Sequence, residues 1–429
     1  MSIRGSYQRL PATVPPELEL DLDAMAYGGE AIGRFDGQVV FVPYALPGER
    51  VRVAVERAKK GYSRTRLLDV LRRAPDRVPA PCPYFGACGG CQYQHVRYPA
   101  QLEFKRAVVV EQLQRIGGFA DPDALVRPTL GMVTPWEYRN HARFSLGRRY
   151  GELGFTRKET HRLLRIDYCW LMVPQINRAL EILQRRCLGL ATHQVTIRYS
   201  PRTGQLLVQP AIPEVPELET GQPFLEEELL GQRFRVAPSA FFQINTRPES
   251  RALPASIDAP WIAERQGTWS MAELLALTVL DRLGPAPLRR VVDAYCGVGT
   301  FAVLLAERAA EVVGIEESPA AVRDARHNAR DLPNVRFEEG KTEEVLPRLE
   351  GPVDAVVLDP TRVGCHPAVL EALLALRPPR VVYVSCDPAT LARDLKILVA
   401  GGYDLRSVEP LDLFPQTYHV ESVSLLHLR

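Results

Sequence analysis

From about residue 270 to the end of the chain, short apolar runs rich in β-branched residues alternate with helix-like stretches. The alternation is clearest in RRVVDAYCGVGTFAVLLAERA, EVVGIEESPAAVRDARHNARD, DAVVLDP and RVVYVSCDP, after a predicted helix in TWSMAELLALTVLDRL. This pattern predicts a doubly wound, mainly parallel sheet, and such sheets bind ligands at the carboxyl ends of their strands. The pattern therefore fixes both a fold class, α/β, and the edge on which a site is expected.

The rest of the chain follows other patterns, and 429 residues are too many for a single core. Residues 17–73 form short alternating runs broken at hairpin-like intervals by glycine pairs such as Gly28-Gly29, which predicts a small OB-like barrel of about five strands. Residues from about 126 to 250 predict a mixed α/β region. We therefore expect three domains, over 1–74, 75–250 and 251–429, with a helix over 100–117 that packs on the last.

Composition and charge narrow the class of protein. No apolar run reaches the ~18 residues of a membrane span, and the first residues lack the apolar core of a signal peptide, so we expect a cytoplasmic protein without a membrane partner and a monomer. The formal net charge is only +2, but basic residues crowd one part of the predicted barrel: Arg50, Arg52, Arg57, Lys59, Lys60, Arg64, Arg66, Arg72, Arg73 and Arg77. Such a cluster indicates phosphate binding, hence RNA, or else a solvated strand face.

A candidate cofactor site follows the first strand of the alternating region. The segment VVDAYCGVGTF leaves its strand at Asp293 and turns through Gly297 and Gly299, so a ligand can approach the backbone closely. The turn lacks the third glycine of the dinucleotide fingerprint. Glu316 ends the next strand, where an acid accepts hydrogen bonds from a ribose. This combination favours S-adenosylmethionine (SAM), and Asp359 in LDPTRVGC is predicted to face the same crevice, a plain turn being the alternative.

A cysteine ends another strand on this edge. In VVYVSCDPATLARD, Cys386 is followed by Asp387 and Pro388, which are predicted to be the N-cap and first residue of a helix. Because thiolates are favoured near helix N-termini, we expect Cys386 to be a nucleophile with a lowered pKa. Cys296, inside the glycine turn, and Cys365, after a flexible glycine, are weaker candidates.

A nucleophilic thiol beside SAM points to methylation of uracil. Carbon 5 of uracil is a poor nucleophile, but addition of a thiolate to carbon 6 gives an enolate whose carbon 5 can attack the methyl group. A base must then remove the proton from carbon 5 so that the thiol can leave. Glu421 in FPQTYHVESVSLLHL is the candidate base, although a lone glutamate on a strand usually faces solvent.

Three cysteines lie close together in CPYFGACGGC, with the spacing C-x5-C-x2-C: Cys82, Cys88 and Cys91. Eight cysteines in a cytoplasmic chain of this length indicate metal binding or catalysis rather than a disulfide framework. Three thiolates at this spacing suit zinc or an iron–sulfur cluster, and Cys169 in IDYCW is the nearest remaining candidate for a fourth ligand. The spacing differs from the C-x3-C-x2-C of radical-SAM enzymes.

These segments together resemble the uracil-C5 RNA methyltransferase family, in particular its iron–sulfur branch that modifies 23S ribosomal RNA. GGEAIGRFDGQVVFVPYALPGERV is similar to the N-terminal TRAM domain of that family, and further motifs occur in the family's order: FFQINT, DAYCGVGTF, GIEES, LDPTRVG, VSCDPATLARD and FPQTYHVES. The resemblance covers nearly the whole chain. It implies a Rossmann-like class I SAM methyltransferase domain, a TRAM barrel and a central α/β domain that carries a [4Fe–4S] cluster.

The resemblance also implies roles for individual residues. Cys386 is the implied nucleophile and Glu421 the implied base. The implied SAM contacts are Gln243, Tyr295, Gly297, Thr300, Glu316 and Asp359, and the implied cluster ligands are Cys82, Cys88, Cys91 and Cys169. The chain departs from the family at three places: Thr300 and Asp387 stand where Asn is common, and Lys341 where Asn or Asp is common.

The leading hypothesis is therefore SAM-dependent formation of 5-methyluridine in large-subunit ribosomal RNA. The target uracil must be flipped from its stack, and we expect further RNA contacts from Arg139, Asn140 and Arg143 in YRNHARF. The cluster is expected to be structural or to contact RNA, because the reaction needs no electrons. Two alternatives stay open: the same chemistry on the T-loop uridine of transfer RNA, which the TRAM-like module and the cluster disfavour, and an RNA-binding iron–sulfur redox sensor with an inactive SAM fold.

Overall fold

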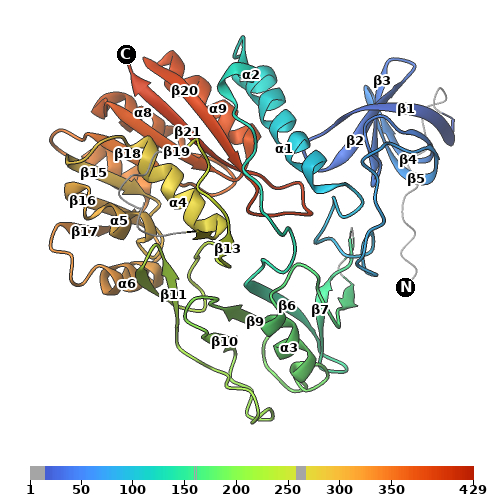
Figure 1. Ribbon diagram of the computed structural model, residues 1–429, viewed down its shortest axis with the longest axis horizontal. Helices are drawn as coiled ribbons and strands as arrows, with labels where there is room; N and C mark the ends of the chain where they lie inside the picture. Colours follow the sequence, from blue (N-terminus) through green and yellow to red (C-terminus); the bar gives the residue numbers. More distant parts are fainter. Residues whose placement is uncertain (1–14, 159, 161, 258–266) are drawn as a thin grey trace.

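The structure is a computed structural model that describes residues 15–158, 160, 162–257 and 267–429 (Figure 1). A closed barrel, a five-stranded sheet and a seven-stranded sheet account for most of its strands. In Figure 1 the barrel lies at the upper right, the seven-stranded sheet at the upper left and the five-stranded sheet below them. Within these described ranges, no helix is both long enough and apolar enough to cross a membrane.

The predicted N-terminal barrel is confirmed, with its strands in the order β1-β2-β3-β5-β4. Alternate residues of β1 face the interior, where Leu18, Leu20 and Leu22 are buried, because successive side chains of a strand point to opposite faces. The five strands are β1 (Glu17–Met25), β2 (Glu30–Phe35), β3 (Gln38–Pro43), β4 (Arg50–Lys59) and β5 (Tyr62–Arg72).

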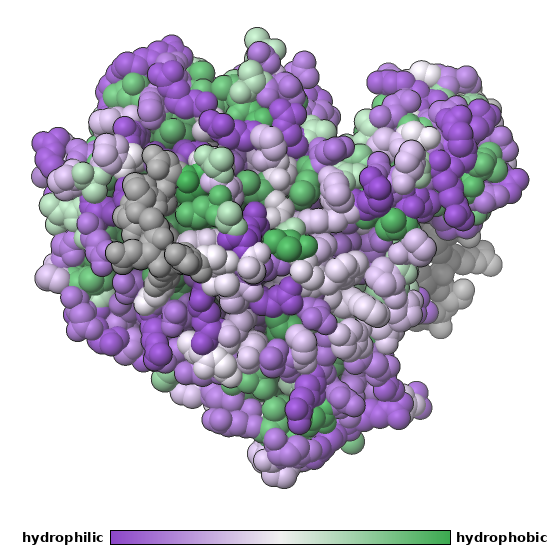
Figure 2. Space-filling view, viewed as in Figure 1, coloured by the Kyte–Doolittle hydropathy of each residue, from purple (hydrophilic) through white to green (hydrophobic). Residues whose placement is uncertain are grey.

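Acidic residues pair with several of the arginines that the sequence groups together on the barrel. Arg50 and Arg72 both form ion pairs with Asp21 of β1, and Arg52 pairs with Asp69 across the β4–β5 ladder. Hydrophilic residues cover much of the barrel surface (Figure 2). For these three arginines the solvated strand face is therefore the better of the two interpretations, since exposed ion pairs of this kind neutralise charge and contribute little stability.

The middle of the chain builds an antiparallel sheet in the order β10-β9-β6-β7-β8, with α3 packed against β9. Its core contains Phe144, Leu153 and Ile197, together with Leu180 of the helix. The hairpin β11–β12 and a two-stranded antiparallel ladder, β13–β14, follow it along the chain. The elements are β6 (His141–Gly147), β7 (Glu152–Thr156), β8 (Leu163–Arg165), α3 (Pro174–Leu183), β9 (Gln194–Tyr199), β10 (Leu206–Gln209), β11 (Leu225–Leu229), β12 (Gln232–Val236), β13 (Glu249–Ser250) and β14 (Thr268–Trp269).

The predicted doubly wound sheet is also confirmed, with the order β17-β16-β15-β18-β19-β21-β20. Six of the seven strands run in the same direction, and only β21 is antiparallel, between β19 and β20. Its strands are β15 (Leu288–Ala294), β16 (Ala309–Glu316), β17 (Val335–Glu339), β18 (Ala355–Leu358), β19 (Arg380–Ser385), β20 (Tyr403–Leu411) and β21 (Glu421–Leu428). Its helices are α4 (Met271–Arg282), α5 (Thr300–Leu305), α6 (Pro319–Asn328), α7 (Thr342–Val345), η3 (Leu346–Arg348), α8 (Pro367–Leu376) and α9 (Pro388–Ala400).

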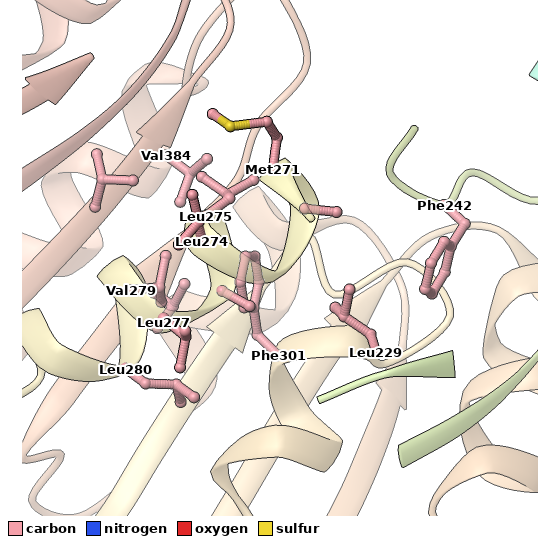
Figure 3. Packing of buried hydrophobic residues seen from close by; sticks show 14 of the residues in the cluster. Leu229, Phe242, Met271, Leu274, Leu275, Leu277, Val279, Leu280, Phe301 and Val384 are labelled. Atoms are coloured by element: carbon pink, nitrogen blue, oxygen red, sulfur yellow. The ribbon is translucent and has the colours of Figure 1, made fainter. Parts of the chain in front are cut away.

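Two apolar clusters cover the two faces of this sheet. On one face α4 is buried nearly all round, and its Leu274 and Leu275 lie near Val384 of β19 and Phe301 of α5 (Figure 3). A capping box between Ser270 and Glu273 satisfies the first N–H groups of α4. On the other face α8 and α9 contribute Leu373 and Leu395 to the second cluster.

A long helix connects the barrel to the C-terminal sheet. Helix α1 (Tyr98–Gln112) and the π turn η1 (Leu113–Gly117) end at Gly118, whose φ of 73° terminates the helix as the sequence predicts. Both pack against α9, and the short α2 (Pro122–Leu125) packs on β20. Lys105 of α1 also forms a buried ion pair with Asp412, which ties the helix to the segment between β20 and β21.

Candidate active site and cysteine pocket

The parallel pairing of β15, β16 and β18 brings the predicted SAM residues to one edge of the sheet. Ala294 pairs with Ile315 and Leu358, so Tyr295, Glu316 and Asp359 follow at the same level. The turn after β15 holds Tyr295, Gly297 and Gly299 at φ values of 68°, 56° and 83°. Positive φ at a non-glycine residue is uncommon and marks Tyr295 as a strained position at this edge.

Glu316 closes the turn from the neighbouring strand. Its carboxylate accepts hydrogen bonds from the N–H of Gly297 (3.0 Å) and the N–H of Ser318 (2.8 Å). A Cβ atom built on Gly297 would meet nothing within 4 Å, so there is open space beside this backbone. Glu316 therefore lies at a strand end beside a turn that a ligand can approach closely.

Asp293 lies beneath the turn, although the sequence analysis gave it no role. It is fully buried, its Oδ2 accepts a hydrogen bond from the N–H of Ala302 (2.8 Å), and its Oδ1 has no hydrogen-bond partner. Burial raises the pKa of Asp293 well above the ordinary value of an aspartate. Its position at the end of a strand before a glycine turn was the available sequence signal.

Cys386 lies where β19 passes into α9, as predicted. Asp387 is the N-cap of α9, its Oδ1 accepts hydrogen bonds from the N–H groups of Ala389 and Thr390 (3.0 Å each), and Pro388 takes the first helical position. Cys386 is half-buried, whereas Cys296 and Cys365 are buried at 5% and 4% exposure. Of these three thiols, Cys386 is the one that a substrate reaches most easily.

The antiparallel pairing of β19 with β21 brings Glu421 to the same place. Ser385 pairs with Ser422, so Cys386 and Glu421 are the next residues of the two strands at the sheet edge. Glu421 is only 4% exposed, in contrast to the usual solvent-facing strand glutamate. Burial, and secondarily the charge of Asp359, raises the pKa of Glu421 well above its ordinary value.

The expectation that the helix N-terminus lowers the pKa of Cys386 is wrong. Burial, and then the Glu421 carboxylate, raises the pKa of the thiol to about 12, while the guanidinium of Arg362 opposes the shift. A partly buried thiol among carboxylates favours its neutral form, and this outweighs the helix dipole. Burial likewise raises the pKa of Asp359 to about 7. A positively charged ligand at this edge would favour the ionised forms of Cys386, Glu421 and Asp359.

Among the remaining predicted SAM residues, Gln243 is half-buried and Thr300 opens α5. Lys341 is exposed and precedes α7 as its N-cap, with no side-chain capping bond. The structure therefore brings Tyr295, Gly297 and Thr300 onto one turn, but it shows no polar contact that ties Gln243 to that turn within the described residues.

The four cysteines that the sequence groups as metal ligands line a single cavity of about 400 Å³. Cys82, Cys88 and Cys91 come from the loop before α1, and Cys169 from the loop after β8. The N–H of Gly90 donates a hydrogen bond to the Cys88 sulfur (3.4 Å). The Asn177 side chain accepts a hydrogen bond from the N–H of Cys169 (2.8 Å) and donates one to the Cys169 carbonyl (3.0 Å). Tertiary structure thus joins residues that are up to 87 positions apart, counting 169 − 82.

These four thiols stand around the cavity rather than at one point. Within the described part of the chain, no three or more His, Cys, Asp or Glu side chains are close enough to hold one metal ion. A [4Fe–4S] cluster takes one thiolate on each of its irons, so its ligands are spaced more widely than those of a single zinc. Four thiols are the ligand set that such a cluster takes, and the cavity brings all four of them together.

A second cavity, of about 520 Å³, lies between the barrel, the cysteine loop and the segment before β21. Four basic residues line it: Arg64, Arg139, Lys158 and Arg362. Tyr27, Tyr418 and His419 add ring surfaces, and Tyr418 lies 4.1 Å from His419 between ring centres. A basic cavity with aromatic surfaces is suited to nucleotides, because cations bind phosphates and rings stack on bases.

The structure separates the three residues expected to add RNA contacts. Arg139 lines both cavities and Arg143 is exposed beside the cysteine pocket. The prediction for Asn140 is wrong, because its side chain is buried and bound to Glu227, Thr246 and the Tyr199 carbonyl. Tyr27 and Arg362, near Cys386, were not predicted from the sequence. Arg362 lies within the LDPTRVGC segment, three residues after Asp359, but no local pattern points to Tyr27.

Comparison with known proteins agrees with this arrangement. A methyltransferase domain family matches residues 287–403, and the TRAM domain family matches residues 14–68. An uncharacterized RNA methyltransferase of Halalkalibacterium halodurans is 34% identical over 99% of this chain and 100% of its own length. Another, of Gloeobacter violaceus, is 38% identical over 94% of this chain and 95% of its own.

A solved structure extends the similarity to a reaction. The tRNA (uracil-54, C5)-methyltransferase of Pyrococcus abyssi, in complex with S-adenosyl-L-homocysteine, superposes with a TM-score of 0.70 and 25% identity, over 95% of this chain and 100% of that one. The seven-stranded sheet is a class I methyltransferase fold, and the cofactor is SAM. The chain is thus an RNA methyltransferase and belongs to the uracil-C5 RNA methyltransferase family.

Proposed function

We propose that this enzyme methylates carbon 5 of a uridine in 23S ribosomal RNA, with Cys386 as nucleophile and Glu421 as base. The observation that carries the proposal is the β19–β21 register, which places a half-buried thiol and a buried carboxyl side by side at the SAM edge of the sheet. The roles require a nucleophile and a base that reach one ring from neighbouring positions.

Each step of the reaction has a residue that can perform it. The Cys386 thiolate adds to carbon 6 of the uracil, forming a C–S bond and an enolate. Carbon 5 then attacks the methyl group that SAM supplies, and S-adenosylhomocysteine leaves. Glu421 accepts the proton from carbon 5, the C–S bond breaks, and the product is 5-methyluridine with the thiolate restored. Arg362, which opposes the rise in the pKa of Cys386, favours the thiolate.

The same edge supplies the proposed SAM contacts. We assign the ribose to Glu316, whose carboxylate already accepts N–H groups across the turn. The remaining contacts are assigned to Gln243, Tyr295, Gly297, Thr300 and Asp359. The open space beside Gly297 supports close approach of the ligand to the backbone.

We assign a [4Fe–4S] cluster to Cys82, Cys88, Cys91 and Cys169, on the strength of their common cavity. When bound, the cluster would cross-link the cysteine loop to the five-stranded sheet. The methylation steps consume no electrons, so the cysteines hold structure rather than pass charge to the substrate. The three parts of the chain then divide the work, with RNA binding in 1–74, the cluster in 75–250 and the chemistry in 251–429.

Transfer RNA is the second candidate substrate, and one observation favours it. The Pyrococcus abyssi enzyme is named for uracil 54 of tRNA, and its structure aligns over its whole length with 95% of this chain. A protein of that overall architecture can therefore act on tRNA, which weakens the argument that the domain layout alone selects ribosomal RNA. The basic cavity next to Tyr27 and Arg362 supports either RNA.

A methyl-transfer assay with labelled SAM separates the candidates. Purified protein is incubated with unmodified large-subunit ribosomal RNA and, separately, with unmodified tRNA, and products are mapped by mass spectrometry. 5-Methyluridine in ribosomal RNA supports the proposal, whereas label in tRNA alone keeps the chemistry and changes the substrate. Cys386→Ala is the matched control and should abolish label in either RNA. RNA binding without label in wild type would support the redox-sensor alternative.

A further inference from the structure

A turn of the N-terminal barrel contacts the start of helix α9, which follows the proposed nucleophile Cys386 directly. The hydroxyl of Tyr27, in the β1–β2 turn, donates a hydrogen bond of 2.6 Å to Oδ2 of Asp387, although the residues are 360 positions apart. Gly28 and Gly29 follow at φ values of 108° and 83°. A Cβ on Gly29 would lie 3.1 Å from that of Gln92 and 3.2 Å from that of Tyr418, so the turn is wedged between two loops.

The two oxygens of Asp387 have different partners. Oδ1 caps α9 by accepting the N–H groups of Ala389 and Thr390, and also faces the Thr390 hydroxyl (3.3 Å). Oδ2 accepts the Tyr27 hydroxyl. Burial, and then the bond to Asp387, raises the pKa of Tyr27, so the hydroxyl keeps its proton and remains the donor. The barrel therefore supplies the side-chain donor to the second oxygen.

Asp387 places a carboxylate next to the thiol that must ionise. The charged groups that act on Cys386 are Glu421 from β21, Asp359 from the end of β18, Arg362 from the loop after β18, and Asp387 itself. Tyr27 and His419 lie near Asp387, Tyr418 packs on Tyr27, and Arg362 faces His419. Three carboxyl groups against one guanidinium disfavour a thiolate, and a hydrogen bond donated to one of the carboxylates reduces its repulsion.

We propose that Tyr27 is a positioning residue through which the barrel completes the active site, by holding Asp387 and weakening its opposition to the Cys386 thiolate. This inference rests on the proposed role of Cys386. It makes the barrel part of the chemistry as well as an RNA-binding module. Displacing the β1–β2 turn would leave Asp387 without the donor to its second oxygen.

Tyr27→Phe tests this role, because it keeps the ring that lies edge-on to Tyr418 (5.7 Å between ring centres) and removes only the hydroxyl. The thiolate is measured without RNA, as the rate at which iodoacetamide alkylates Cys386, mapped by mass spectrometry. We expect the rate at about pH 8 to fall, because a higher pKa of the thiol lowers the fraction present as thiolate. The pH profile should move toward higher pH, with SAM affinity unchanged.

The rescue experiment distinguishes electrostatics from packing. Asp387→Asn keeps an oxygen to cap α9 and removes the charge, so Tyr27→Phe added to it should change the alkylation rate by less than about twofold. Tyr62→Phe, another barrel tyrosine, is the matched control and should leave the profile unchanged. An unshifted profile for Tyr27→Phe, or a loss that Asp387→Asn does not rescue, overturns the inference.

The two proposals fail in different ways. If wild-type protein methylates RNA without a covalent Cys386 adduct, the proposed function is wrong and this inference falls with it. If the adduct forms normally while Tyr27→Phe behaves as wild type in alkylation, only the role of Tyr27 is wrong.

Discussion

Ser385 of β19 lies opposite Ser422 of β21, and this pairing determines which residues meet at the end of the sheet. Because the strands are antiparallel, the residue after Ser385 and the residue before Ser422 lie at the same edge. They are Cys386 and Glu421. A shift of one residue in this register would turn Glu421 to the opposite face of the sheet.

Glu421→Gln should trap the enzyme on its RNA. The amide cannot accept the proton from carbon 5, so methyl transfer proceeds and elimination of the thiol slows, with turnover reduced about 10²- to 10⁴-fold. The measurement is a protein–RNA adduct that survives denaturing gel electrophoresis and maps to Cys386. Cys386→Ala in the same background should remove the adduct. Normal turnover by Glu421→Gln without an adduct would show that another group is the base.

Methylation should accelerate as pH rises. The pKa of Cys386 is raised to about 12 and that of Glu421 is raised well above its ordinary value, so both lose their reactive, ionised forms as pH falls. Between about pH 6 and pH 9, kcat/KM should therefore increase with pH rather than reach a plateau near neutrality. Single-turnover adduct formation by Glu421→Gln reports the ionisation of Cys386 alone. If neither kcat/KM nor the rate of adduct formation changed with pH, the raised pKa values of Cys386 and Glu421 would be contradicted.

The cysteine cavity should hold iron. Anaerobically purified protein is expected to contain about four irons and about four acid-labile sulfides per chain, with visible absorbance. Cys88→Ser should lose iron while SAM affinity is retained, since the cavity is lined by the cysteine loop and the five-stranded sheet rather than by the SAM turn. Cys187→Ser is the control, because Cys187 is buried near α3 outside the cavity. One zinc without visible absorbance would exclude the cluster.

Arg139→Gln should weaken RNA binding through charge. Arg139 lines both the cysteine pocket and the basic cavity, so its loss removes a cation from the proposed RNA path. The expected result is weaker binding of all RNA sequences and a slope of log K against log salt reduced by about one. Arg178→Gln, at an exposed position of α3, is the matched control. An unchanged salt slope for Arg139→Gln would place the RNA elsewhere.

Breaking the buried ion pair between Lys105 and Asp412 should destabilise the fold. Both side chains are 0% exposed, with 2.5 Å between Nζ and Oδ1, so Lys105→Met leaves an unpaired buried carboxylate at a cost of about 3–5 kcal/mol. Lys105→Met with Asp412→Leu should cost less than Lys105→Met alone. Urea unfolding gives both values. Arg115→Met, from an exposed pair with Glu111, should change stability by at most about 0.5 kcal/mol.

The local pattern of the sequence was sufficient for the fold classes and for several caps. Alternating burial in β1, the Gly118 stop of the first long helix and the Asp387–Pro388 start of α9 all depend on residues close together in the chain. Motif order also placed Cys386, Glu316 and Asp359 on strand ends. Local rules work here because a cap or a strand period involves only a few neighbouring residues.

The charge environment and ionisation of several residues were predicted wrongly from the sequence. The barrel arginines Arg50 and Arg72 share Asp21, which lies about 30 to 50 residues earlier in the chain. The helix dipole suggested a low pKa for Cys386, whereas burial and Glu421 raise it. Asn140 looked like an RNA contact and is instead buried in a polar network. Each result depends on neighbours that are remote in sequence.

The sequence by itself determined that a SAM-binding sheet, a barrel and a cysteine group are present, because these are encoded in short periods and spacings. Tertiary structure alone decided that Glu421 is buried beside Cys386, that Cys169 joins the other three cysteines around one cavity, and that Tyr27 reaches Asp387. The physical reason is that burial and electrostatic contact depend on distance in space. The residues in contact here are 35 positions apart in the chain for Cys386 and Glu421 (421 − 386) and 360 for Tyr27 and Asp387.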